Sequence, residues 1–398
     1  MGDHRSGTDE QWDDTAPVIL AGTPGTFARS VFHDRHPTLI ERVLEAHPYG
    51  APERTALREL LAETLHGTVR PLRTAAADAP SWDRWGAPWW GRPWGELPFL
   101  WAESYFYRRL LEAVGYFRPG VWQGIDPFGP TKDAELAGAE VTAELAALDE
   151  LASAAGPVQR DALLMSALWG NQADLGFRLV AGSTGRSDGL LADDREELWA
   201  ALAAAPAGRL HLIADNAGRE LLPDLALLDH LLVTGTVATA TLWLKPQPYF
   251  TSDATMTDLL GALRRLRAAG AGTAAGQLGD RLWQASGTGA LSVRTHEFFC
   301  APAGFDEMPD DLRAAFDGAA LTVCKGDLNY RRLVGDRYLP PTTPFAARAG
   351  YFPTPVAALR TLKSDVITGL TADRVAALDA TGRPWRSNGE HALIQCAR

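Results

Sequence analysis

Two stretches of the sequence offer hard oxygen ligands at positions that a parallel sheet would bring together. Asp215 and Asn216 follow the apolar run 209–214, and Asp253 follows a second apolar run, 240–244, after a proline-rich loop. Carboxylate and amide oxygens suit Mg²⁺ or Mn²⁺. Asp and Asn are also good residues for starting a helix. Spacing alone therefore leaves two interpretations open, a metal site and a pair of helix caps.

Basic residues follow a third apolar run, 321–324, where Lys325 and Gly326 begin a polar stretch. A glycine turn flanked by cationic side chains can hold an oxyanion through its backbone N–H groups and those charges. An exposed loop with solvated charges explains the same pattern. The segment 360–363, Arg-Thr-Leu-Lys, repeats the basic theme, with an ordinary amphipathic helix as the alternative.

Asn171 and Asp174 lie in an apolar segment, where polar side chains need partners in the protein or in a substrate. The motifs of several other enzyme classes are absent from the chain. It contains no GxxxxGK[ST] phosphate loop, no GxGxxG after a strand, no HExxH and no GxSxG.

The elements that must position these residues alternate in type from about residue 160. Short apolar runs predict strands, and periodic segments between them predict helices. This alternation is typical of an α/β protein, an α/β/α sandwich with a mainly parallel, Rossmann-like sheet. In such sheets, sites collect beyond the carboxyl ends of the strands. The predicted strands are 209–214, 240–244, 321–324 and 392–396, and the predicted helices are 221–232, 258–269 and 309–319.

The first part of the chain has a different texture. Residues 1–16 are polar and acidic and are expected to be a disordered tail. Residues 17–158 carry helical periodicity and predict a helical subdomain, so 159–398 would be the catalytic α/β/α domain. Tryptophans gather in the helical part and are expected to fill its contact with the rest of the chain, sugar or partner binding being the alternative. They are Trp82, Trp85, Trp89, Trp90, Trp94 and Trp101.

Composition narrows the possible partners. The chain has 398 residues and a formal net charge of −11, which argues against nucleic-acid binding. Its three cysteines are widely spaced and suggest neither a disulfide framework nor a zinc site. No apolar run approaches the roughly 18 residues of a membrane span, and the N-terminus has no secretory pattern. A cytoplasmic protein is expected, and the many glycines and alanines are typical of a high-GC bacterial sequence.

Five separated blocks of this sequence resemble one known family, the damage-control phosphatases, once a domain of unknown function. The resemblance runs from about residue 30 to residue 396, and the last block carries the RTxK signature of the subfamily that includes a protein-glutamate O-methyltransferase and sugar-phosphate phosphatases. The blocks are SALWGNQADL, ADNAGRELLPDL, LKPQPYFTSDAT, CKGDLNYRRLVGDR and RTLKSD.

The resemblance implies roles for individual residues. Asp215, Asn216 and Asp253 would bind a divalent metal, with Mn²⁺ expected first and Co²⁺, Ni²⁺ or Mg²⁺ as alternatives, and the two aspartates would be catalytic. Glu220 falls where a methyltransferase would contact S-adenosylmethionine. The substrate would be held by Lys325, Gly326, Asp327, Leu328, Asn329, Tyr330, Arg331 and Lys363, with Asn171 and Asp174 facing the same cleft.

The predicted function is metal-dependent hydrolysis of small phosphorylated metabolites, sugar phosphates such as fructose 1-phosphate. In this interpretation the metal neutralises phosphate charge, while Arg331, Lys363 and Lys325 bind the phosphate oxygens. Two alternatives remain open from the sequence. One is carboxyl methyl transfer from S-adenosylmethionine to a protein side chain, and the other is a binding protein that has kept a metal and phosphometabolite site without catalysis.

Overall fold

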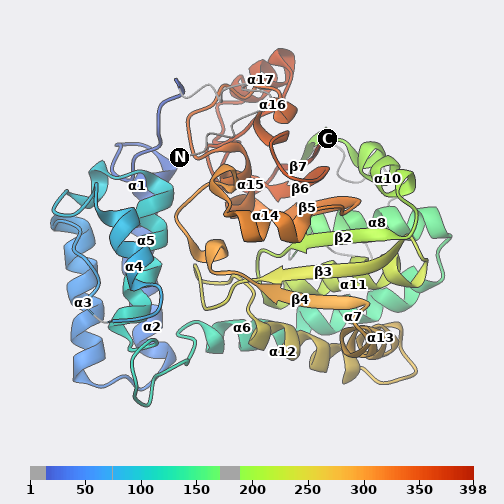
Figure 1. The fold of residues 1–398 in the computed structure, drawn as a ribbon, viewed down its shortest axis with the longest axis horizontal. Coiled ribbons are helices and arrows are strands. Elements are labelled where there is room, and N and C mark those ends of the chain that lie inside the picture. Colours follow the sequence, from blue (N-terminus) through green and yellow to red (C-terminus); the bar gives the residue numbers. More distant parts are fainter. Residues whose placement is uncertain (1–14, 74, 171–188) are drawn as a thin grey trace, which may run out of the picture.

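The computed structural model describes residues 15–73, 75–170 and 189–398. Figure 1 shows a group of helices from the first third of the chain beside a twisted sheet that helices cover. The sheet has seven strands in the order β1-β7-β6-β5-β2-β3-β4. The strands are β1 (Leu190–Asp193), β2 (Gly208–Ile213), β3 (Val237–Leu244), β4 (Leu291–Thr295), β5 (Leu321–Lys325), β6 (Val356–Thr361) and β7 (Ala392–Ala397).

Neighbouring strands of the sheet are parallel, except that β6 and β7 are antiparallel. The chain passes from β2 to β3 and β4 on one side, and then returns to β5 and β6 on the other. The direction of winding therefore reverses between β2 and β5. In open α/β sheets, ligands bind at such a switch point, beyond the carboxyl ends of the two strands.

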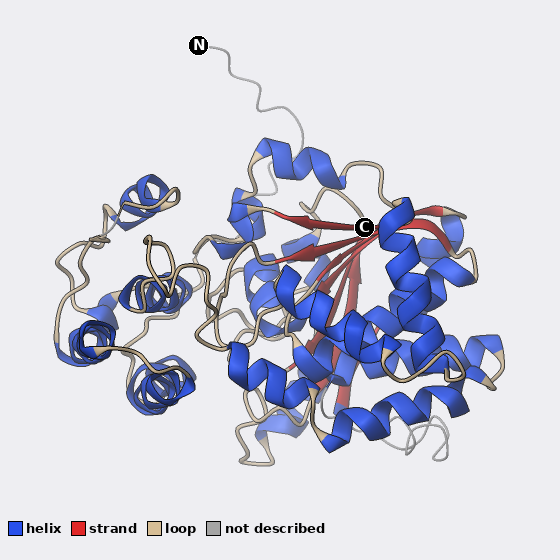
Figure 2. Cartoon of the chain, turned by 90° about the horizontal axis from the view of Figure 1, so that it is seen from below, coloured by secondary structure: helices blue, strands red, loops and turns tan. Residues whose placement is uncertain are grey.

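Alternating side chains of the strands give the sheet a hydrophobic core on each face. Leu212 of β2 belongs to one buried cluster, and Ile213, the next residue, belongs to the other. Apolar side chains of the helices complete both layers, which confirms the α/β/α sandwich (Figure 2). Helices of the first cluster are α7 (Ala139–Ala152), α8 (Gly156–Trp169), α10 (Arg195–Ala204), α11 (Leu221–Val233), α12 (Met256–Arg267) and α13 (Ala274–Thr288). Helices of the second are α14 (Asp310–Phe316), α15 (Gly326–Val334), α16 (Phe345–Ala349) and α17 (Ala372–Asp379).

The N-terminal helices form the body on the left of Figure 1. Phe27 to Ala46 is one helical stretch whose middle turn widens into a π-helix, in which the His36 N–H donates to the Val31 carbonyl. Pro37 has no N–H for the usual bond to the carbonyl four residues earlier, so the wider turn forms there. The helices of this body are α1 (Phe27–Ser30), η1 (Val31–Arg35), α2 (His36–Ala46), α3 (Ala51–His66), α4 (Ala79–Gly86) and α5 (Phe99–Ala113). Helix α6 (Gly129–Leu136) follows them and lies beside α12 (Figure 1). Short 3-10 turns are η2 (Trp94–Glu96), η6 (Gly218–Glu220), η7 (Glu297–Cys300) and η8 (Phe305–Glu307).

The tryptophan cluster is a core of the helical part itself, and not a filling between two parts as the sequence analysis predicted. The rings gather around Tyr105 of α5, with Trp82, Trp90 and Trp101 centred 4.9–5.4 Å from its ring. Trp82 and Trp94 are almost fully buried. The cluster therefore stabilises α5, the central helix of this part.

The four predicted strands and three predicted helices are confirmed within a few residues, whereas β1, β4 and β6 were not predicted. The alternative of an amphipathic helix over 360–363 is wrong, because Arg360 and Thr361 end strand β6. The predicted tail lies outside the described residues, apart from residues 15 and 16. The boundary at residue 158 stays a prediction, and it falls inside α8, which packs against α11, while the preceding helix α7 packs against α13.

Candidate active site

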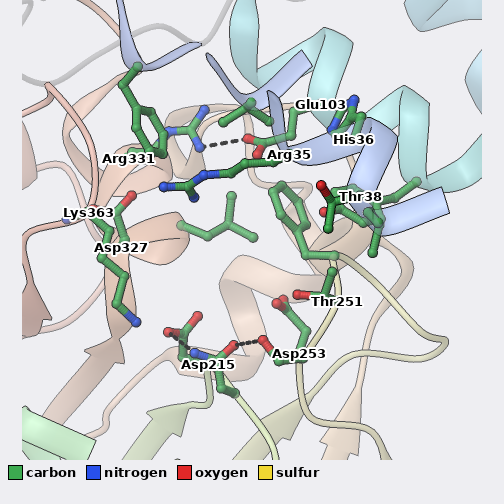
Figure 3. Close-up of a pocket in the computed structure, with 18 of the residues that line it drawn as sticks. Arg35, His36, Thr38, Glu103, Asp215, Thr251, Asp253, Asp327, Arg331 and Lys363 are labelled. Atoms are coloured by element: carbon green, nitrogen blue, oxygen red, sulfur yellow. Dashed lines mark hydrogen bonds and ion pairs between the residues drawn. The ribbon is translucent and has the colours of Figure 1, made fainter. Parts of the chain in front are cut away.

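A cavity of about 470 Å³ lies where the carboxyl ends of the parallel strands face the N-terminal helices (Figure 3). Residues after β2, β3, β5 and β6 line one side, which we call the strand side. Residues of α1, η1, α2 and α5 line the other, which we call the helix side. The strand side includes half of the residues that the sequence singled out, seven of fourteen.

The three predicted metal ligands meet on the strand side. Asp215 and Asn216 follow β2, and an isolated antiparallel bridge pairs Asn216 with Asp253. The Ala254 N–H donates to the Asp215 carbonyl at 2.9 Å, which joins the two loops through their backbones. The Asn216 amide donates to Asp215 Oδ2 at 3.2 Å, and its oxygen accepts from Ser252 at 2.6 Å. Backbone pairing therefore brings residues 38 positions apart into one cluster.

The loop that carries Asp253 is held in a strained but well-supported conformation. Phe250 adopts a φ of +50°, which is uncommon for a bulky residue and costs about 1–3 kcal/mol. Its ring stacks on Tyr107 of α5 with centroids 4.8 Å apart. Lys132 of α6 is buried and donates to the Asp253 carbonyl at 3.0 Å. The helical elements thus fix the position of a strand-side ligand.

Both aspartates of this cluster are almost completely buried, Asp215 at 8% and Asp253 at 3% exposure. Burial, the charge of Asp253 and the charge of Glu220 raise the pKa of Asp215 well above its usual range. Burial also raises the pKa of Asp253, against the opposing effect of Lys245, whose Nζ lies 3.3 Å from Asp253 Oδ2. Two adjacent buried carboxyls of this kind are stabilised by a bound cation.

These residues fit a hard divalent cation. Asp253 Oδ2 is buried, and the Lys245 ammonium group at 3.3 Å is its ion-pair partner within the described residues. With the Asp215 carboxylate and the Asn216 amide oxygen, Asp253 Oδ2 makes an all-oxygen donor set, which magnesium and manganese prefer. Among the described residues, no group of three or more His, Cys, Asp or Glu side chains is arranged as a metal site. In a site made of these residues, the Asn216 amide would be the third ligand.

Gly326 allows β5 to approach this cluster. A Cβ atom at Gly326 would lie 1.8 Å from Asp215 Oδ2, and the residue has a φ of +85°. Glycine is the residue that tolerates both the close approach and the left-handed backbone. Gly326 was predicted to lie beside the phosphate. In the structure, glycine is needed at this position because the Asp215 carboxylate leaves no room for a side chain.

Lys363 is the cation of the strand side that reaches toward the carboxylates. Figure 3 shows its side chain extending toward Asp215, and its Nζ lies 3.6 Å from Glu220 Oε1. Burial lowers its pKa, but Glu220, Asp215 and Asp327 outweigh this effect and raise it, so Lys363 is charged. Glu220 also accepts from the Asn216 amide at 2.8 Å. Glu220 therefore joins the lysine to the ligand cluster.

Asp327 and Arg331 line the cavity, but protein groups already occupy much of their bonding capacity. Asp327 Oδ1 accepts from Arg360 at 2.8 Å; burial raises its pKa, but Arg360 and other donors hold it below the usual value. Arg331 donates to Glu103 at 2.9 Å and to Asp336 at 2.7 Å. Leu328 supplies an apolar part of the wall. Arg331 is thus a fixed part of the wall.

Three of the predicted substrate residues are turned away from the cavity. Lys325 is paired with Asp224 at 3.0 Å and donates to the Ala167 carbonyl. Asn329 donates to backbone carbonyls, and the Tyr330 hydroxyl donates to the Gln395 side chain at 2.8 Å. Their position supports a role in holding β5 and α15 in place. Nothing in this arrangement supports the phosphate contacts that the sequence analysis assigned to them.

The predicted contacts of Asn171 and Asp174 lie outside the described residues. Gly170, the last described residue before them, abuts Glu220, whose Cγ would be 2.7 Å from a Cβ at that glycine. The first of the five sequence blocks thus approaches the ligand cluster through its described end.

No residue of the helix side of the cavity was predicted as a site residue. The residues it contributes include a buried glutamate on α5 and a polar face of the helix that runs from η1 into α2. The available signal was helical spacing, because positions 35, 38, 39 and 42 share one face of a helix. The residues of the helix side are Phe27, Val31, Asp34, Arg35, His36, Thr38, Leu39, Arg42, Glu103 and Tyr107.

No helix in the described part of the chain combines the length and the apolar character needed to cross a bilayer.

A solved structure of a DUF89 family protein from Pyrococcus horikoshii shares the fold, with a TM-score of 0.50 at 14% sequence identity over 92% of this chain and 97% of that one.

Curated relatives are similar over most of their length. "Damage-control phosphatase ARMT1" of Danio rerio is 30% identical over 76% of this chain and 74% of its own, and that of Rattus norvegicus is 27% identical over 96% and 98%. The protein of the same name in Homo sapiens is 29% identical over 76% and 75%. The family model described as the damage-control phosphatase ARMT1-like domain matches residues 31–378. This chain therefore belongs to the ARMT1-like damage-control phosphatase family.

Proposed function

We propose that the protein is a metal-dependent phosphatase of small phosphorylated metabolites, with sugar phosphates such as fructose 1-phosphate as the first class to test. The observation that carries the proposal is the buried pair Asp215 and Asp253, joined through Asn216 at the switch point of the sheet. Two adjacent buried carboxyls are costly when both are charged, unless a cation compensates them. Membership of a phosphatase family supports the same activity.

Asp215, Asn216 and Asp253 would hold the divalent cation, with Mn²⁺ expected first. Such an ion supplies positive charge that neutralises a phosphoryl group. Lys363 is charged and extends toward the same point, so it would bind the phosphate oxygens that the ion leaves free. Glu220 contacts both Lys363 and the Asn216 amide, and so would hold the two side chains in position relative to each other.

The proton of the attacking water is assigned to Asp253. This carboxylate lies in the proposed ligand cluster, and its Oδ2 is 3.3 Å from the ammonium group of Lys245. The leaving alcohol would point toward the helix side, since the strand side is occupied by the ligand cluster. Hydrolysis then needs no covalent change in the protein.

The test is phosphate release from a panel of sugar phosphates and other small phosphate esters, with Mn²⁺, Co²⁺, Ni²⁺ or Mg²⁺ and with EDTA. We expect turnover that requires a divalent ion and is greatest with one compound class. A parallel assay measures methyl transfer from S-adenosylmethionine to protein carboxylates. Methyl transfer without metal-dependent phosphate release would overturn the proposal, as would phosphate release that EDTA leaves unchanged.

A further inference from the structure

The helix side of the cavity carries two arginines on one helical face. Arg35 ends the π-helical turn and Arg42 lies seven residues later, about two turns along α2, with Thr38 and Leu39 between them on the same face. All four line the cavity that contains Asp215. A face of this kind, opposite the proposed metal site, meets the part of the substrate that is not being hydrolysed.

These arginines differ from the other cations of the cavity in having no acidic partner. Arg331 is paired with Glu103 and Asp336, and Lys363 is near Glu220. Arg35 and Arg42 form no ion pair within the described residues and are exposed. Two solvated, unpaired guanidinium groups that line a cavity are available for a ligand.

The position of Arg35 is set by the fold. Its guanidinium carbon lies 4.7 Å above the Phe27 ring, and Figure 3 shows the side chain lying across the cavity toward Asp327 and Arg331. The π-helical turn before Pro37 sets the direction in which Arg35 leaves the helix, and such turns are frequent at functional sites. Cation–π contact and local geometry both keep the guanidinium over the cavity.

The charge of this face remains positive after its acidic neighbour is counted. Asp34 precedes Arg35 and also lines the cavity. One carboxylate against two guanidinium groups leaves one net positive charge. Guanidinium groups bind carboxylates and phosphates in a bidentate manner and do not distinguish sharply between the two.

We propose that the preferred substrate is a phosphate ester with a second anionic group at its far end, a carboxylate or a second phosphate, which Arg35 and Arg42 bind. This inference rests on the proposed phosphatase function, because it names the substrate class of the same site. The reacting phosphate lies at Asp215 and Asp253, and the second anion selects the molecule that enters.

The experiment compares pairs of esters that differ only in the distal group. Glycerol 3-phosphate is paired with 3-phosphoglycerate, sorbitol 6-phosphate with 6-phosphogluconate, and fructose 1-phosphate with fructose 1,6-bisphosphate. The first two pairs test a carboxylate at two lengths, and the third tests a second phosphate. The variants are Arg35→Gln and Arg42→Gln, with Arg58→Gln as control, since Arg58 is exposed on α3 and outside the cavity.

For the wild-type protein we expect kcat/KM to be roughly 10- to 100-fold higher for the anionic member of at least one pair, the range of one or two charge-assisted hydrogen bonds. Arg35→Gln and Arg42→Gln should remove most of this ratio while turnover of the neutral member changes less than about threefold. Arg58→Gln should keep the full ratio. Calorimetric binding of the same pairs, with Ca²⁺ replacing the active ion, gives a readout that does not need turnover.

Each remaining outcome decides the matter. Equal kcat/KM for both members of every pair overturns the inference and leaves the phosphatase proposal intact. An equal loss for both members in the arginine variants also overturns it, because the arginines would then act on the reacting phosphate or on folding. Arginine-dependent preference in binding without any phosphate release supports the anion site and overturns the phosphatase. Loss of both readouts overturns both proposals.

Discussion

The two sides of the cavity are built on opposite principles. On the strand side, carboxylates and cations are buried and tied to one another, as Asp253 is to Lys245 and Arg331 to Asp336. On the helix side, Arg35 and Arg42 are exposed and have no acidic partner within the described residues. The fixed groups are suited to chemistry, which needs preorganised geometry. The free groups are suited to selecting a ligand.

The contrast has an energetic meaning. Each buried carboxyl of the ligand cluster costs folding free energy when it is charged, which the raised pKa of Asp215 reflects. The exposed arginines of the helix side cost the fold little, since water solvates them. Substitutions on the two sides should therefore affect activity and stability in different ratios.

Asp215→Asn should have the largest effect, and it should change both the rate of hydrolysis and the free energy of unfolding. Hydrolysis should fall by at least about 10³-fold, because a charged ligand of the cation is lost. Without metal at pH 8, the free energy of unfolding should rise by about 1 kcal/mol or more, because a buried charge near Asp253 and Glu220 disappears. Phosphate release and urea unfolding in EDTA measure the two effects.

Asp280→Asn is the control for Asp215→Asn, because its pair with Arg267 is exposed and distant from the cavity. Added Mn²⁺ should stabilise the wild-type protein and this control against urea, but should leave Asp215→Asn unchanged. A variant at position 215 that unfolds more easily in EDTA than the wild-type protein would contradict the contrast between the two sides.

The metal-ligand cluster of the strand side could be predicted from sequence because its residues follow recognisable strands. Asp215 comes within two residues of β2, and Asp253 ends the proline-rich loop after β3, so the rule for parallel sheets brings the two together. Lys363 was noted as part of a basic segment, but its role was assigned through the RTLKSD block, since β6 itself was not predicted. Its sequence, Val-Ala-Ala-Leu-Arg-Thr, is buried at every position and lacks the alternation of a half-exposed strand.

The helix side could not be predicted, because helical spacing says which residues share a face but not what that face meets. Arg35 and Arg42 look like ordinary solvated charges until tertiary packing sets η1 and α2 across from the sheet. Lys325 shows the opposite failure. A lysine beside a glycine turn suggested phosphate binding, yet its partner Asp224 is a hundred residues away in sequence and leaves it inside the protein.

Gly326→Ala tests how tightly the strand side is packed. The new methyl group would collide with Asp215, and alanine is strained at this φ, so we expect a loss of about 1–3 kcal/mol in unfolding free energy. Mn²⁺ affinity, measured by calorimetry, should fall by roughly tenfold or more, since the carboxylate must move. Gly289→Ala is the matched control, because its φ of +86° imposes the same backbone strain while no atom beyond its chain neighbours lies within 4 Å of the added carbon. Unchanged Mn²⁺ affinity in Gly326→Ala would show that the cluster is looser than the structure indicates.

Lys132→Met tests whether the helical elements support the strand side. Lys132 donates at 3.0 Å to Asp126, Asp258 and the Asp253 carbonyl, so its removal leaves acceptors without a donor. We expect unfolding free energy to fall by about 2–4 kcal/mol and Mn²⁺ affinity to fall by roughly 10-fold, as for other residues that orient metal ligands.

Arg267→Met is the control for Lys132→Met, since its pair with Asp280 is solvent-exposed and contributes at most about 1 kcal/mol. Circular dichroism during urea unfolding and calorimetric Mn²⁺ titration provide the two measurements. If Lys132→Met loses stability but keeps full Mn²⁺ affinity, the lysine supports the fold alone and the loop of Asp253 is positioned without it.

Glu103→Gln gives the smallest effect and tests the one buried, paired group of the helix side. Burial raises the pKa of Glu103 from 4.5 to about 7, against the opposing effect of Arg331. Its contribution to stability is therefore present below pH 4.5 and is lost as pH rises through 7. Urea unfolding should show that the free energy of unfolding of the wild-type protein decreases between pH 5 and pH 8. In Glu103→Gln this decrease should be smaller by roughly 1–3 kcal/mol. An equal decrease in the wild-type protein and in Glu103→Gln would mean that Glu103 is ionised over the whole range from pH 5 to pH 8, held in that form by its pair with Arg331.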